Sequence, residues 1–131
     1  MNILLVDDKP LILDAISKLL ENSGFTVHTA YNGLDAYKKA QKFCYDLFVV
    51  DHLMPLMDGI QFSKNLKKHE PSANKPIVFM TTQDLKSVSH GGYAHLFDEI
   101  IAKPINEAKF LSFVDKFAAI SMENNQELAM V

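Results

Sequence analysis

The sequence has one cysteine, no long apolar run and no excess of positive charge. Cys44 has no second cysteine with which to form an internal disulfide, so nothing suggests an oxidising compartment. The apolar run near the N-terminus, residues 3–6, is too short for a signal peptide or a membrane span, so no membrane interaction and a cytoplasmic location are expected. A net charge of −3 argues against direct nucleic-acid binding, which normally needs a strongly basic surface.

What the sequence does contain is an alternation of short apolar runs with longer amphipathic stretches. Several runs are apolar throughout, which is typical of strands covered on both faces in a parallel sheet. The runs are residues 3–6, 26–30, 47–50, 77–80 and 100–102. Between them, helical spacing predicts a first helix from Pro10 to just before Gly24, and Asn32 and Asn106 are expected to cap the second and last helices. A short fourth helix is expected near residues 85–90.

Five strands alternating with five helices predict an α/β doubly wound domain, in which ligands bind beyond the carboxyl ends of the strands. Polar residues fall at those strand ends. Asp7 and Asp8 follow the first strand, Asp51 the third, Thr81 ends the fourth and Lys103 the fifth. The topology would therefore bring all five side chains to one edge of the sheet.

Three carboxylates at one edge repel one another, and a divalent cation would remove that penalty. Hard carboxylate oxygens suit Mg²⁺, and no Cys and His cluster with zinc spacing competes. Lys103 and the Thr81 hydroxyl would add a positive charge and a hydrogen-bond donor around a transferring phosphoryl group. Asp51 is the expected nucleophile, because carboxylates form acyl phosphates.

Four motifs, taken in order, closely resemble the receiver domains of two-component response regulators. They are Asp7-Asp8, the segment from Asp51 to Gly59, Thr81, and Lys103-Pro104. The resemblance implies a flavodoxin-like sheet of five parallel strands in the order 2-1-3-4-5 with five helices. It covers nearly the whole chain, with a receiver domain over residues 1–122 and a polar tail or linker stub over 123–131.

The resemblance also implies a phosphoacceptor switch with Mg²⁺ as its cofactor. Asp51 would accept a phosphoryl group from phosphohistidine on a sensor histidine kinase or a histidine phosphotransfer domain. Asp8 and Asp51 would bind Mg²⁺ directly, Asp7 partly through water, and the backbone carbonyl of Leu53 would complete the protein ligands. A downstream protein target would then read the changed surface.

Further roles follow from the same resemblance. Lys103 would pair with the phosphoryl group, Thr81 would move toward it, and Pro104 would follow a cis peptide bond. The sequence departs from the family at Ile100, where most receivers carry Tyr or Phe. His52, next to the acceptor, is interpreted as a loop residue that lines the site.

Three other functions stay open at this point. A receiver-like adaptor that binds proteins without phosphorylation is favoured by Ile100. A phosphatase of the haloacid dehalogenase type would need a second Asp at the position of Leu53, and a flavin-binding module would need a less acidic loop than residues 7–10. A homodimer through exposed apolar residues around 96–100 is a further hypothesis.

Overall fold

The computed structural model describes residues 1–130 and the side chains of residues 1–124. Its five strands form one parallel sheet in the order β2-β1-β3-β4-β5, which confirms the predicted topology. The strands are β1 (Asn2–Val6), β2 (Thr26–Ala30), β3 (Leu47–Asp51), β4 (Ile77–Thr81) and β5 (Glu99–Ala102). The helices are α1 (Pro10–Asn22), α2 (Gly33–Lys42), α3 (Gly59–Lys68), α4 (Leu85–Ser89) and α5 (Glu107–Met130), with short 3₁₀ turns η1 (Glu70–Ser72) and η2 (Ala94–Leu96).

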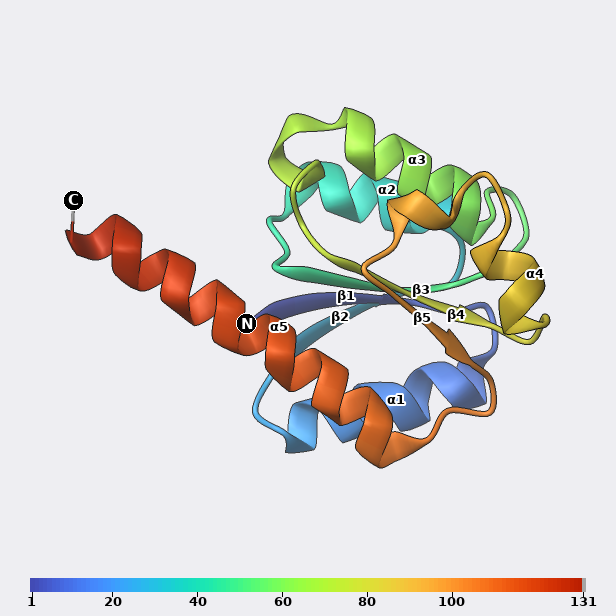
Figure 1. Cartoon of the computed structure of the whole chain (residues 1–131), viewed down its shortest axis with the longest axis horizontal. Helices are drawn as coiled ribbons and strands as arrows, with labels where there is room; N and C mark the ends of the chain where they lie inside the picture. The colour runs from blue at the N-terminus through green and yellow to red at the C-terminus, as the bar shows by residue number, and fades with distance from the viewer. Residues whose placement is uncertain (131) are drawn as a thin grey trace.

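Helices cover both faces of the sheet, with α1 and α5 on one side and α2 and α3 on the other (Figure 1). Successive residues of a strand point to opposite faces, and β1 shows the consequence. Ile3 and Leu5 pack into the cluster that contains the α1 and α5 side chains. Leu4 and Val6 pack into the cluster that contains those of α2 and α3. This burial on both faces explains why the strands read as continuous apolar runs.

The predicted helix boundaries are confirmed where a specific residue sets them. Pro10 opens α1, and Gly24 follows its end with φ +94°, a conformation that glycine adopts without strain. The Asn32 side chain accepts a hydrogen bond from the backbone N–H of Asp35 at 2.8 Å, as expected of an N-cap. Asn106 accepts in the same way from the N–H of Lys109 at 3.0 Å, so it caps α5.

The last helix, α5, runs past the edge of the sheet and projects away from the body of the domain (Figure 1). Its buried side chains, Phe110, Val114 and Phe117, belong to the part that packs on the sheet. The expected domain boundary at residue 122 falls inside this helix and stays a prediction, and residue 131 of the expected tail lies outside the described residues. Among the described helices, none is both long and apolar enough to cross a membrane.

One prediction about the surface is wrong. Leu96 is buried, with only 8% of its surface exposed, and the Phe97 ring stacks on Phe79 with the ring centroids 4.0 Å apart. Ile100 is half-buried. These residues fill the space outside β4 and β5 because α4 is only five residues long. They do not form the exposed apolar patch that was the reason to expect a homodimer.

Candidate functional site

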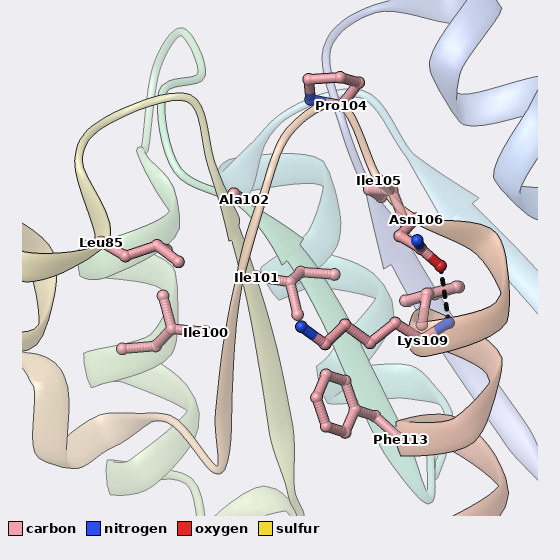
Figure 2. A pocket seen from close by; sticks show the side chains of 10 residues that line it. Leu85, Ile100, Ile101, Ala102, Pro104, Ile105, Asn106, Lys109 and Phe113 are labelled. Atoms are coloured by element: carbon pink, nitrogen blue, oxygen red, sulfur yellow. Dashed lines mark hydrogen bonds between the residues drawn. The ribbon is translucent and has the colours of Figure 1, made fainter.

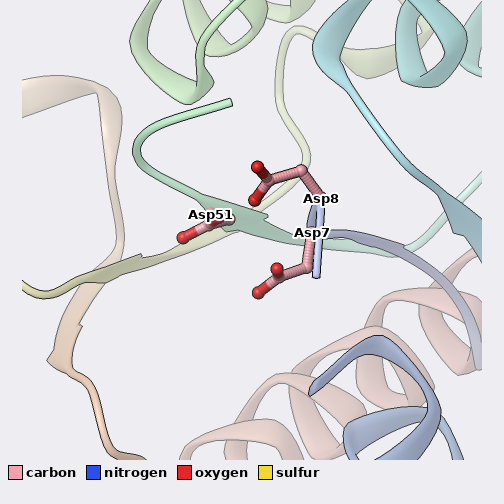
Figure 3. A group of neighbouring side chains, drawn as sticks. All are labelled: Asp7, Asp8 and Asp51. Atoms are coloured by element: carbon pink, nitrogen blue, oxygen red, sulfur yellow. The ribbon is translucent and has the colours of Figure 1, made fainter. Parts of the chain in front are cut away.

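The carboxyl ends of the strands bring the predicted polar residues together. Asp7 follows β1 directly, Asp51 is the last residue of β3, and both side chains are buried. Asp8 is half-buried beside them. Figure 3 shows the three side chains converging on a common space, and each offers a carboxylate oxygen within 4.8 Å of the others.

Lys103 holds two of these carboxylates. Its Nζ lies 2.7 Å from Asp7 Oδ2 and 3.0 Å from Asp51 Oδ1, and its side chain is only 7% exposed. The Lys103 N–H donates to the carbonyl of Thr81 at 2.8 Å, and the peptide bond to Pro104 is cis. Lys103 is therefore held at its ammonium by carboxylates at the ends of β1 and β3, and at its backbone by β4.

The two oxygens of Asp51 have different surroundings. Oδ1 accepts hydrogen bonds from Lys103 Nζ and, at 3.0 Å, from the backbone N–H of His52. Oδ2 is buried and has no hydrogen-bond partner among the described residues, and Lys9 Nζ lies 3.9 Å away. Burial raises the pKa of Asp51, the hydrogen bond from Lys103 opposes the rise, and the negative charge of Asp7 adds to it.

This arrangement fits a hard divalent cation. Three carboxylates face the two ammonium groups of Lys103 and Lys9, which leaves an excess of negative charge, and Asp51 Oδ2 has no hydrogen-bond partner in the part of the chain whose side chains are described. Oxygen ligands in this number, with room for water, are what Mg²⁺ prefers. Within the described part of the chain, no histidine or cysteine joins the group, so a zinc-like ligand set is absent there.

The loop after Asp51 is held close to the strand by its backbone. The Gly59 N–H donates to the carbonyl of His52 at 2.9 Å. A Cβ on Gly59 would lie 2.1 Å from the carbonyl oxygen of Asp51, so only glycine fits there. Leu56, in the same loop, adopts φ +70° and is 80% exposed. The side chain of Leu53 is also exposed, and the metal-binding role of its carbonyl stays a prediction.

The structure gives His52 a partner that sequence reasoning missed. Its Nδ1 lies 2.9 Å from Thr81 Oγ1, and both side chains are buried. Burial lowers the pKa of His52, although the Asp58 carboxylate opposes the shift. The sequence indicated only that His52 follows Asp51 and lies near the end of β4, which does not reveal where its ring points.

Ile100 lies on β5, on the side of the strand that faces Leu85 of α4 (Figure 2). It lines a hollow together with Ile101 and the side chains of Lys109 and Phe113 from α5. No aromatic ring occupies this position, so any movement of Thr81 has no ring on β5 to displace.

Taken together, fold and site define a phosphoacceptor switch of the α/β doubly wound class. The sequence profile of the response regulator receiver domain matches residues 3–115, so the chain belongs to this family. Members are signalling switches of two-component systems rather than enzymes, and they partner with histidine kinases. Membership places the chain outside the dehalogenase-type phosphatases and flavin-binding modules.

Similar proteins agree with this assignment. The chemotaxis response regulator CheY4 of Vibrio cholerae is 30% identical, with a TM-score of 0.82 over 88% of this chain and 97% of that chain. The response regulator TrrA of Thermotoga maritima, solved in complex with Mg²⁺-BeF, is 28% identical, with a TM-score of 0.80 over 88% of this chain and 97% of that one. The probable transcriptional regulator ycf29 of Porphyra purpurea is 29% identical over 97% of this chain, which spans 61% of that relative's length.

Proposed function

We propose that Asp51 accepts a phosphoryl group from phosphohistidine on a sensor histidine kinase or a histidine phosphotransfer domain. The observation that carries the proposal is Asp51 Oδ2 at the end of β3, a buried carboxylate oxygen without a hydrogen-bond partner among residues 1–124. Oδ1 is already held by Lys103 and the His52 N–H, so Oδ2 is the oxygen available for attack.

In this reaction Oδ2 forms a bond to phosphorus while the P–N bond to the donor imidazole breaks. The electrons of that bond go to the imidazole nitrogen, which takes up a proton and leaves as neutral histidine. The product is an acyl phosphate on Asp51. Lys103 stands within hydrogen-bonding distance of Asp51 and would stabilise the charge that develops on the phosphoryl oxygens.

We propose Mg²⁺ as the cofactor of this site. Asp8 and Asp51 would bind it directly, Asp7 partly through water, and the carbonyl of Leu53 would complete the protein ligands. The metal would supply positive charge that offsets the three carboxylates and the incoming phosphoryl group. The Mg²⁺-BeF complex of TrrA supports this choice of metal and of phosphoryl site.

The surroundings of the site support docking of a protein donor. Leu11 at the start of α1 is 87% exposed, and Leu56 is exposed in the loop after β3. An apolar groove between α1 and the segment after β5 contains Leu11, Ile16 and Ile105 and reaches Lys103. Exposed leucines beside a buried acidic site suit a partner that presents a histidine from an apolar helix face. The proposal includes a cytoplasmic location, where ATP maintains such donors, and a downstream protein target.

The test is an intact-mass measurement after incubation with acetyl phosphate and Mg²⁺. We expect one added phosphoryl group, which is absent in EDTA and in Asp51→Asn. A matched variant, Asp115→Asn, changes an exposed carboxylate and should keep the adduct. If the wild type gains no phosphoryl mass and does not respond to beryllofluoride, the proposed phosphorylation is wrong and the phosphorylation-independent adaptor is favoured.

A further inference from the structure

The Thr81 hydroxyl is engaged before any phosphoryl group arrives. Its oxygen accepts a hydrogen bond from the backbone N–H of Gln83 at 3.0 Å and lies 2.9 Å from His52 Nδ1. In the part of the chain that the structure describes, these are the hydrogen-bond partners of the Thr81 side chain. The donor in the contact with His52 is set by the His52 tautomer, and the Thr81 hydroxyl donates its one proton when Nδ1 is unprotonated.

The other side of the His52 ring contacts aromatic residues. Its centroid lies 4.9 Å from that of Phe79 and 6.2 Å from that of Tyr93. Tyr93 in turn lies 6.3 Å from Phe97, which stacks on Phe79. Rings thus connect Thr81 to the segment between α4 and β5, which packs near α3 through η2.

We propose that His52, with its ring proton on Nε2, is a positioning residue: its Nδ1 accepts the Thr81 hydroxyl proton before phosphorylation, and its ring transmits the movement of Thr81 to Tyr93 afterwards. The inference rests on the proposed function, because it needs a phosphoryl group on Asp51. Once that group is present, the Thr81 hydroxyl donates to a phosphoryl oxygen. One proton cannot serve both acceptors, so His52 Nδ1 loses its partner and the ring repacks against Tyr93 and Phe79.

In this proposal His52 and Tyr93 take the role of the aromatic residue that β5 lacks at Ile100. Ile100 is half-buried on β5, where an aliphatic side chain has little to displace. His52 already lies close to both Thr81 and the aromatic ring of Tyr93. The surface that changes on phosphorylation is therefore the segment around Tyr93, between α4 and β5.

The experiment uses the full chain labelled with 3-fluorotyrosine. The sequence has four tyrosines, so the ¹⁹F NMR spectrum has four resonances, and Tyr93→Phe assigns the one that matters. Beryllofluoride with Mg²⁺ is titrated as the phosphoryl mimic. In the wild type we expect the Tyr93 resonance to shift with the same midpoint as binding measured by calorimetry.

Two variants separate the hydrogen bond from the ring. His52→Phe keeps a ring but removes the acceptor, so the released Thr81 hydroxyl should tighten beryllofluoride binding about three- to tenfold, the size of one neutral hydrogen bond. His52→Asn keeps an acceptor near the place of Nδ1 but removes the ring, so affinity should stay near the wild type. In both variants the Tyr93 response should be largely lost. His28→Phe is the matched control, because His28 makes a similar bond to Tyr45 in another part of the fold.

Each outcome decides the inference. A full Tyr93 shift in both His52 variants, or unchanged affinity in His52→Phe, would overturn it while the proposed function stands. If the His52 variants fold poorly, Thr81→Ala provides the test, because it frees His52 permanently. The Tyr93 resonance of its ligand-free form should move toward the bound position, and no movement would overturn the inference. Failure of the wild type to bind beryllofluoride would overturn the proposed function as well.

Discussion

Replacing Asp51 by asparagine should stabilise the metal-free protein even though it removes the proposed acceptor. Only 4% of the Asp51 surface is exposed, its carboxylate lies near Asp7, and Oδ2 has no hydrogen-bond partner among the described residues. Asparagine removes the buried charge and the repulsion. Its oxygen can still accept from Lys103 and from the His52 N–H in the place of Oδ1.

The gain in the free energy of unfolding is limited, because asparagine still places a polar group without a partner where Oδ2 lies. An unsatisfied buried polar group costs about 1–3 kcal/mol, and the amide nitrogen would take the unpartnered place of Oδ2. Only the part of the penalty that comes from charge is recovered. We therefore expect a gain of about 1 kcal/mol in the free energy of unfolding, or about 3–5 °C in Tm for a chain of this size.

The dependence on pH has a definite sign. Burial raises the pKa of Asp51 above 3.8, so the native state keeps its proton to a higher pH than the unfolded state. The metal-free wild type then loses stability as pH rises from about 3.8 through the native pKa, and the loss is constant above it. The advantage of Asp51→Asn should be smallest below 3.8 and fully developed at neutral pH.

Urea unfolding in EDTA at neutral and acidic pH measures these differences. Asp115→Asn is the control for the loss of one negative charge, since its carboxylate is exposed. Mg²⁺ at ten times its Kd should stabilise the wild type by about 1.4 kcal/mol and Asp51→Asn by less. An Asp51→Asn protein that is less stable than the wild type in EDTA would refute the reasoning, since the carboxylate would then stabilise the native state.

Three further substitutions test the loop after β3 and the buried lysine of the site. Leu56→Asn should raise the free energy of unfolding by about 0.5–1 kcal/mol in urea, because asparagine tolerates the left-handed backbone at φ +70° better than leucine. Gly59→Ala should lower the free energy of unfolding by about 1–3 kcal/mol, and with it Tm, because its Cβ would clash with the backbone of Asp51. The same substitution should slow phosphorylation by acetyl phosphate. Gly92→Ala, whose added Cβ would meet open space, should change neither Tm nor the rate. Lys103→Met should destabilise by about 3–5 kcal/mol, because it leaves two buried carboxylates without their cation. The same change at the exposed Lys116 should cost under 1 kcal/mol in the same urea assay.

The edge of the sheet that carries the site was predictable because topology alone determines it. Once the apolar runs are identified as parallel strands, the residues that follow them must meet at one edge. Asp7, Asp51, Thr81 and Lys103 needed only this step to be placed together. Caps such as Asn32 were equally accessible, because they depend on neighbours three residues away.

Side-chain direction was not accessible in the same way. Whether His52 lines the loop or turns inward to Thr81 depends on its rotamer and on Phe79 and Tyr93, which come from elsewhere in the chain. Phe97 looked like an exposed apolar residue because its stacking on Phe79 of β4 depends on packing between segments that are distant in the sequence. Local sequence patterns carry little of that information.

The imbalance of charge at the site links the fold to its function. Asp7, Asp8 and Asp51 meet the buried ammonium of Lys103 and the exposed ammonium of Lys9, so three carboxylates face two positive charges at the metal-free site. This excess of negative charge favours a bound cation, and the cation would in turn offset the charge of an incoming phosphoryl group. The two hydrophobic layers on the faces of the parallel sheet stabilise the fold despite this imbalance of charge. The pair of Thr81 and His52 lies between this charged edge and the packed core, and under the proposal above phosphorylation of Asp51 would alter the surface through this pair.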